Sequence, residues 1–279
     1  MDVVKNRYGK DLRQSDEYAN FMSRIGWQIP EIPKSKFQMF IKRFGFLTVA
    51  KIRRAREITD WGELKNILNK YRINMCRIDP ETADVKEYKN NGFKLEKNQM
   101  VATKTLLLDL TGSENELLME FKTETRRKLK RDVNYEIRNM NNFDEFYEIL
   151  KNGYREIDVW CPSKSEYQAL IDSFEKKCFC VTIDNKAGCL VIIHKQVAEY
   201  YYASATKMGK AENLPYVIAW MAINEARHRG AKVWDWNGLY DDRYPENRYI
   251  GFSFFKKRFG GVEMEFPGGF LGWRLLGHW

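Results

Sequence analysis

The sequence is organised around the stretch Gly251-Phe252-Ser253-Phe254-Phe255-Lys256-Lys257-Arg258-Phe259-Gly260-Gly261. Its aromatic residues surround two lysines and an arginine, and the glycine pair is typical of the end of a short helix. A lysine on an amphipathic helix is commonly a solvated charge. Whether Lys256 has a function therefore depends on the motifs found in the rest of the chain.

Composition limits the function classes. The chain of 279 residues carries a formal net charge of +9 and has a sequence pI of about 9.1, so an anionic partner is expected, whether nucleic acid, a phosphorylated metabolite or a membrane surface. No apolar run is long enough to span a bilayer. The first residues lack the apolar core of a secretory signal, and the five cysteines have no metal-type spacing. These features favour a cytoplasmic protein without a metal centre.

The first part of the chain alternates strands with helices. Strands are expected over 37–43, 46–53, 73–78 and 105–110, with helices over 17–25 and 60–70. This pattern predicts an α/β unit that spans residues 1–111.

The clearest helix is expected over 113–132. Ser113 and Glu116 form a capping box, and an apolar face opposes a strongly basic one. A charge run of this kind is either a solvated face or a surface for phosphates, and the scarcity of acidic partners favours phosphates or RNA. The basic residues concerned are Lys122, Arg126, Arg127, Lys130 and Arg131.

The second part again mixes strands and helices and ends with a central helix and a strand. A strand over 134–138 and helices over 143–154 and 163–176 precede three strands over 178–184, 188–194 and 198–206. A central helix over 214–229 then leads to a strand over 232–236. The sequence therefore predicts a second α/β unit over 112–261, although the two halves share no visible repeat.

Several chemistries are excluded by the absence of their motifs. There is no G-x-S-x-G, no Walker A loop and no dinucleotide fingerprint, and none of the three histidines has a nucleophile near it in sequence. Acyl transfer from an already activated ester remains, because it needs substrate positioning and oxyanion stabilisation more than acid–base groups.

A set of short motifs resembles the FemABX family, the aminoacyltransferases that build peptidoglycan cross-bridges. The resemblance covers most of the chain from Trp27 and is densest over 105–261. Its motifs include Thr123–Arg131, Tyr200–Ser204, Asp235-Trp236-Asn237-Gly238 and Phe255–Gly261. It implies an α+β fold of two GNAT-like domains, each with a mixed, mostly antiparallel sheet flanked by helices. The tail over 262–279 is expected to join the first domain.

The resemblance also implies a reaction. An amino acid would move from aminoacyl-tRNA, as co-substrate and without another cofactor, to the stem-peptide amine of lipid II or UDP-MurNAc-pentapeptide. Lys256 matches the family lysine that stabilises the tetrahedral intermediate or the tRNA end, and Asp79 matches an acidic residue that faces the site. Arg155, Tyr202 and Phe255 are expected to serve substrate binding.

The chain departs from the family pattern at several points. Gln28 follows Trp27 where the family carries a lysine nearby, the first domain is short, and the family's coiled-coil arm is absent. Two other functions stay open: a CoA-dependent GNAT N-acyltransferase, and a non-catalytic relative that binds RNA or the cell envelope. We expect a monomer, and the aromatic tail over 268–276 leaves open a peripheral contact with the inner face of the membrane.

Overall fold

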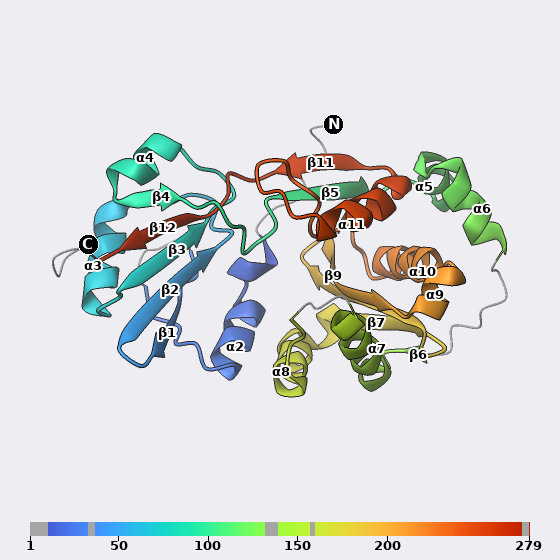
Figure 1. Cartoon of the computed structure of the whole chain (residues 1–279), viewed down its shortest axis with the longest axis horizontal. Coiled ribbons are helices and arrows are strands. Elements are labelled where there is room, and N and C mark those ends of the chain that lie inside the picture. The colour runs from blue at the N-terminus through green and yellow to red at the C-terminus, as the bar shows by residue number, and fades with distance from the viewer. Residues whose placement is uncertain (1–10, 33–36, 132–138, 157–159, 275–278) are drawn as a thin grey trace. The chain divides into compact units, whose positions relative to one another are not determined.

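The computed structural model describes residues 11–32, 37–131, 139–156, 160–274 and 279, which form two compact units (Figure 1). The strand predicted over 134–138 lies outside the described residues. The N-terminal unit comprises Lys10–Thr103, Asp241–Pro245 and Glu265–Trp279. The C-terminal unit comprises Lys104–Tyr240 and Glu246–Met264.

The N-terminal unit is built on a five-stranded sheet of order β1-β2-β3-β12-β4. Strands β2 and β3 are parallel, and the other neighbours are antiparallel. Its strands are β1 (Phe40–Phe44), β2 (Leu47–Arg53), β3 (Met75–Asp79), β4 (Phe93–Leu95) and β12 (Phe270–Trp273). Its helices are η1 (Leu12–Gln14), α2 (Asp16–Arg24), α3 (Trp61–Lys70) and α4 (Val85–Asn90).

Helix α3 covers one face of this sheet because its apolar residues recur at helical spacing. Leu64, Ile67 and Leu68 are buried against Ala50 and Ile52 of β2. On α2, the Tyr18 ring packs edge-on against Phe40 of β1, with ring centroids 5.6 Å apart. The helices thus pack on the sheet through residues that the sequence pattern marks as apolar.

The C-terminal unit is built on a seven-stranded sheet of order β11-β5-β10-β9-β8-β7-β6. Only the β9–β10 pair is parallel among those whose register is described. Its strands are β5 (Lys104–Asp109), β6 (Asn139–Met140), β7 (Cys178–Ile183), β8 (Ala187–His194), β9 (Val197–Ala205), β10 (Val233–Asp235) and β11 (Val262–Glu265). Its helices are α5 (Glu114–Glu120), α6 (Thr123–Arg131), α7 (Phe143–Glu156), α8 (Lys164–Phe174), η2 (Glu175–Lys177), α9 (Lys207–Ala211), α10 (Leu214–His228), α11 (Arg248–Lys256) and η3 (Lys257–Phe259).

Helices cover both faces of this larger sheet. Figure 1 shows α10 on one side of β7–β9 and α7 on the other. The buried residues of α10, such as Ile218 and Ile223, belong to the same cluster as Val181 and Val191 of the strands. Both faces are therefore apolar, which explains the nearly continuous hydrophobic runs of β7 and β8.

The two units share one order of strands. In the N-terminal unit β1-β2-β3 are followed by β12 and β4, and in the C-terminal unit β8-β9-β10 are followed by β5 and β11. In both, an antiparallel pair leads into a parallel pair through a helical connection, which is α3 in the first unit and α9 with α10 in the second. The repetition expected from the sequence is therefore present in the topology.

The boundary between the units differs from the predicted one. We expected the first domain to end at residue 111 and the tail to begin at 262. Instead β5 pairs with β10, so the boundary falls between Thr103 and Lys104, and β11 also belongs to the C-terminal sheet. Sequence order hides this arrangement because β5 follows the first unit directly but completes the second.

The helix predicted over 113–132 is two helices. Helix α5 ends at Glu120, the next residue, Phe121, has an extended backbone (φ −71°, ψ 145°), and α6 begins at Thr123. The Phe121 ring is buried against Trp220 and Phe259 at 5.3 and 5.0 Å, and the Lys122 N–H donates to the Arg258 carbonyl at 2.9 Å. Tertiary contacts therefore break a helix that the local pattern would continue.

Candidate functional site

The candidate site lies where the parallel pair of the C-terminal sheet ends. Strands β9 and β10 stay paired from Val197 and Val233 to Glu199 and Asp235. Beyond that level β9 continues, whereas the chain after β10 turns away at Asn237 (φ 48°) and Gly238 (φ 98°). Both residues have left-handed backbone, which a glycine adopts readily and an asparagine tolerates.

Lys256, the last residue of α11, is fixed against this turn. Its side chain is 9% exposed, and Nζ donates hydrogen bonds to the carbonyl oxygens of Asn237 at 3.1 Å and Gly238 at 2.7 Å. An ammonium group carries three protons. Among the described residues these two carbonyls are its hydrogen-bond acceptors, so one N–H is left for another acceptor. The turn thus holds a buried cation with one donor to spare.

The turn itself is anchored by Asp235. Its Oδ1 accepts the N–H of Asn237 at 2.8 Å and the hydroxyl of Thr105 on β5. Burial lowers the pKa of Lys256 to about 8, and the negative charge of Asp235 partly opposes that shift. The lysine is therefore mainly protonated at neutral pH, yet its proton is held less tightly than that of a solvated lysine.

Aromatic rings pack around the last turn of α11. Phe255 contacts Tyr216 of α10 at 5.0 Å, Trp236 at 5.8 Å and Phe259 at 5.4 Å between ring centroids. These contacts restrict the helix that carries Lys256. Phe255 itself is half-buried, so the predicted substrate-binding residue also has a packing role.

The basic helix α6 lies beside the Lys256 stretch. Glu124 of α6 forms an ion pair with Arg258, and the Lys128 Nζ stands 4.2 Å from the centroid of the Tyr216 ring. Since Tyr216 also contacts Phe255, residues of both α6 and α11 contact the same tyrosine ring. The sequence analysis predicted Phe255 as a site residue and missed Tyr216. The one sequence feature of Tyr216 was its position near the start of the predicted central helix.

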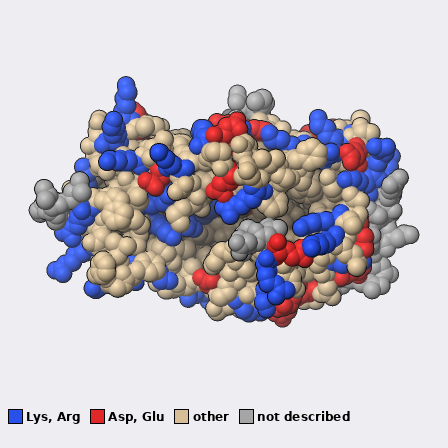
Figure 2. Space-filling view, viewed as in Figure 1, with Lys and Arg blue, Asp and Glu red and all other residues tan. Residues whose placement is uncertain are grey.

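The predicted basic residues of α6 do not share one environment. Lys122, Arg127 and Lys130 are exposed, whereas the side chain of Arg131 lies outside the described residues. Arg126 instead caps α5: its guanidinium donates to the carbonyls of Met119 at 3.2 Å and Phe121 at 2.6 Å. Basic side chains also appear across the visible faces of both units in Figure 2, so the positive charge is not confined to α6.

Tyr202 and Arg155 belong to the opposite side of the sheet. An irregularity pairs Leu190 with Tyr202 and Val191 with Tyr200, which leaves Tyr201 as an extra residue of β9. A bulge turns the following side chain to the other face. Tyr202 accordingly contacts Tyr154 of α7, with ring centroids 6.5 Å apart.

Arg155 follows Tyr154 and is exposed in the last turn of α7. The ring contact between Tyr154 and Tyr202 therefore places the end of α7, which carries Arg155, beside Tyr202. It joins neither residue to Lys256 by a described hydrogen bond or ring contact.

Asp79 ends β3 in the N-terminal unit. It is 4% exposed, and Oδ1 accepts a hydrogen bond from Nε of Arg77 at 3.0 Å. Across the parallel pair it stands opposite Arg53. Asp79 and Asp235 hold equivalent places, each at the end of the second strand of a parallel pair, a correspondence that the sequence alone did not reveal.

Lys51 was not among the predicted site residues. Its Nζ lies 4.4 Å from the Trp27 ring centroid, and burial together with the charge of Arg53 lowers the pKa of its ammonium group to about 8. The sequence signal was the alternation of two basic residues, Lys51 and Arg53, with the apolar residues of this strand. In the described residues, no group of His, Cys, Asp and Glu side chains could hold a metal ion, and no helix is both long and apolar enough to cross a bilayer.

A comparison with protein-family models matches the part of the chain that contains this site. The FemAB family model matches residues 182–272, which include β9, α10, the turn after β10 and the Lys256 stretch. No curated protein matches the sequence significantly.

Three of the solved structures that match cover nearly the whole chain. The crystal structure of FemX matches 94% of this chain and 92% of its own, with a TM-score of 0.72 and 16% identity. The C-terminal domain of a putative lysylphosphatidylglycerol synthetase from Agrobacterium fabrum matches 98% and 91%, with a TM-score of 0.62 and 12% identity. L-PGS from Bacillus licheniformis matches 98% and 91%, with a TM-score of 0.58 and 10% identity. The predicted α/β fold of two units, each a mixed, mostly antiparallel sheet flanked by helices, is confirmed, and the described residues contain no coiled-coil arm.

Proposed function

We propose that this chain, a member of the FemABX acyltransferase family, moves an amino acid from aminoacyl-tRNA to the stem-peptide amine of a peptidoglycan precursor. The aminoacyl-tRNA is the co-substrate, and no further cofactor takes part. The reaction breaks the ester bond to the tRNA ribose and forms an amide bond. The acceptor amine loses a proton, and the tRNA hydroxyl gains one.

The observation that carries this proposal is the buried ammonium group of Lys256. Aminolysis of an ester passes through a tetrahedral intermediate whose oxygen is negatively charged. A preorganised donor in a water-poor site stabilises such an oxyanion by several kcal/mol, typically about 3 to 4. The spare N–H of Lys256 is a donor of this kind, held by two carbonyls and enclosed by aromatic rings.

The remaining predicted residues receive binding roles in the proposal. Arg155 and Tyr202 would contact the precursor, Asp79 would face the reacting groups, and Phe255 would contact substrate while it fixes Lys256. The exposed Lys122, Arg127 and Lys130 would bind phosphates of the tRNA.

The geometry of α10 argues against CoA as the acyl donor. A CoA pyrophosphate would need free backbone N–H groups at the start of this helix. Pro215 occupies its first turn and has no N–H, and Asn213 before it has left-handed backbone (φ 62°). Pro215 therefore removes one donor from the place where the pyrophosphate would lie.

A direct transfer assay tests the proposal. The protein is incubated with a mixture of charged tRNAs and with UDP-MurNAc-pentapeptide or lipid II, and the acceptor is analysed by mass spectrometry. We expect a mass increase of one amino-acid residue on the precursor. Acetylation of the acceptor from acetyl-CoA, without aminoacyl transfer, would favour the CoA-dependent alternative, and neither product would favour a non-catalytic relative.

Lys256→Met is the matched variant for the mechanism. If the ammonium group stabilises the oxyanion, turnover should fall by about 10²–10³ while tRNA affinity stays nearly unchanged. Equal losses of turnover and tRNA affinity would make Lys256 a phosphate contact instead. The unfolding midpoint is measured in parallel, because the variant leaves two buried carbonyls without their donor.

A further inference from the structure

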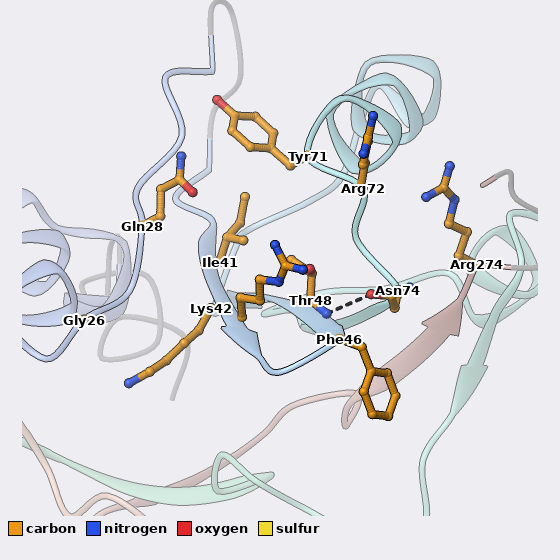
Figure 3. Close-up of a pocket in the computed structure, with 11 residues that line it drawn as sticks. Gly26, Gln28, Ile41, Lys42, Phe46, Thr48, Tyr71, Arg72, Asn74 and Arg274 are labelled. Carbon is orange, nitrogen blue, oxygen red and sulfur yellow. Dashed lines mark hydrogen bonds between the residues drawn. The ribbon is translucent and has the colours of Figure 1, made fainter.

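The N-terminal unit carries a basic pocket that the proposed reaction does not use. It has a volume of about 500 Å³ and lies between the β1–β2 turn, the segment before β3 and the end of β12 (Figure 3). Among the described residues that line it are Lys42, Arg43, Arg72 and Arg274, and no carboxylate. A pocket with this lining favours an anionic group such as a phosphate.

The pocket is separate from the end of the sheet that holds Asp79. Asn74 lines the pocket and bonds to Thr48, with its Oδ1 accepting the Thr48 N–H at 2.8 Å. Asp79 follows five positions later at the far end of β3, roughly 16 Å away at the usual rise of a strand. The pocket therefore belongs to the opposite edge of the N-terminal sheet.

Exposed aromatic side chains surround this edge. Gly45 and Phe46 form the two-residue turn between β1 and β2, and Gly45 has the positive φ of 58° that such a turn needs. Phe46 is 93% exposed and Phe44 is 52% exposed, and in Figure 3 the Phe46 ring projects away from the turn. Trp273, 50% exposed, pairs with Met75 on the same edge.

Burial in the folded protein does not explain why residue 46 is a phenylalanine. A ring that remains almost fully exposed gains little burial, and this position of a hairpin turn accepts small polar residues equally well. Exposed aromatic side chains that gather next to cations instead mark a surface that contacts something else.

The order of these groups matches a bilayer interface. Phe46 stands at the tip, and Arg43 and then Lys42 lie farther back along β1. Arg72 lines the same pocket, whereas the Lys42 ammonium group donates to the Ile25 carbonyl at 2.9 Å. In a membrane, acyl chains lie deeper than the headgroup phosphates, so an apolar tip with cations behind it fits that sequence of layers. Aromatic residues that stack on nucleic-acid bases lie along a charged groove rather than at the tip of a hairpin.

We propose that this edge docks on an anionic phospholipid bilayer, with Phe46 inserted among the acyl chains and a lipid phosphate held by Arg43 and Arg72. The inference is independent of the proposed transfer reaction. The vesicle assay accordingly contains neither tRNA nor acceptor.

Vesicle co-sedimentation of the full chain tests the docking. Vesicles of phosphatidylcholine with phosphatidylglycerol should bind the protein more tightly than vesicles of phosphatidylcholine alone, and added salt should weaken the binding. Phe46→Ser should lower the affinity about tenfold or more, since a phenylalanine side chain loses its burial. Arg43→Ala and Arg72→Ala should each lower it about fivefold.

Two matched controls come from the same unit. Leu95→Ser removes an apolar side chain that is 47% exposed on β4, which pairs with β12 at the level of Phe270, and Lys89→Ala removes an exposed charge on α4. Both should leave vesicle binding unchanged. The proposal is overturned if Phe46→Ser binds like the unchanged chain or if both vesicle types bind equally. It is also overturned if the variants weaken tRNA binding in a separate assay while vesicle binding persists, which would identify an RNA surface.

Discussion

At the scale of single residues, the pKa of Lys256 gives the proposed mechanism a pH signature. Burial lowers that pKa to about 8, so a role that needs the ammonium group is lost as the pH rises through this value. The turnover rate should then fall about tenfold for each pH unit above about 8. Lys256→Arg keeps its charge at all accessible pH values. A turnover profile measured against pH should lose this alkaline limb in the arginine variant, whatever its maximal rate, and an alkaline limb that persists would assign the limb to another group.

The same lysine makes stability depend on pH. In the unfolded chain its pKa is near the ordinary value of 10.5, so between about 8 and 10.5 the unfolded state binds more protons than the folded state. Stability therefore increases with pH in that window, by roughly 3 kcal/mol at most for this group. Denaturant unfolding of the unchanged chain and of Lys256→Met, compared at both ends of the window, isolates the contribution. A constant difference between the two proteins would contradict the lowered pKa.

The part of the site that sequence could predict is limited to residues with a local signal. Lys256 and Phe255 were identifiable because an aromatic, basic helix ends at a glycine pair. Asp235 was visible as part of a motif, but its hydrogen bonds to Thr105 and Asn237 depend on the pairing of β5 with β10, which the predicted boundary had placed in different domains. The direction of Tyr202 depends on a bulge, and a bulge requires knowledge of the register across two strands.

At the scale of secondary-structure elements, most of the fold was predictable because hydrophobic periodicity dominates it. The capping box of Ser113 and the apolar faces of α3 and α7 match their predictions. The exception is the break between α5 and α6. No proline or glycine marks it, and it arises from the Lys122 hydrogen bond to Arg258 more than a hundred residues away. A single-sequence pattern contains no trace of that contact.

This break divides the basic residues into two functional groups. Arg126 binds carbonyl oxygens at the end of α5, so Arg126→Ala should destabilise the protein by about 1–2 kcal/mol and leave the salt dependence of tRNA binding nearly unchanged. Arg126→Lys should also destabilise it, because one ammonium group cannot replace the guanidinium fork. Thermal unfolding of both variants checks the expectation. Full stability of Arg126→Ala would show that α5 ends without this cap.

The exposed residues of α6 should instead set the salt dependence. Arg127→Ala with Lys130→Ala should lower the slope of log affinity for tRNA against log salt by about 0.7 to 0.9 for each lost phosphate contact. The matched control is Lys207→Ala with Lys210→Ala, two exposed lysines at the same spacing on α9. An unchanged slope in the α6 variant, or an equal loss in the control, would remove α6 from the tRNA-binding surface.

At the scale of the whole molecule, each sheet is completed by a strand from a distant part of the chain. Strand β5 directly follows the N-terminal unit but lies between β10 and β11, and β12 from the chain end lies between β3 and β4. Neither unit is therefore a continuous segment, and a truncated chain that stops before β12 would leave two unpaired strand edges. The topology predicts that the stability of the N-terminal unit depends on the last residues of the sequence.

Phe270 of β12 tests this dependence. It is fully buried, its ring lies 4.2 Å from that of Tyr88, and its backbone pairs with both β3 and β4. Phe270→Ala should destabilise the N-terminal unit by about 3–5 kcal/mol, the usual loss for a buried phenylalanine. Phe46→Ala, in the same unit but 93% exposed, is the matched control and should change stability little.

Hydrogen exchange distinguishes local from global effects of that change. In Phe270→Ala, amide protection should fall in β3 and β4 while β7–β9 of the C-terminal unit keep theirs, because the strands of the two sheets are separate hydrogen-bonded ladders. Equal loss of protection in both sheets would mean that the units unfold as one cooperative body. A transfer activity lost together with N-terminal protection, while tRNA binding persists, would then place the acceptor-binding part of the proposed function in the N-terminal unit.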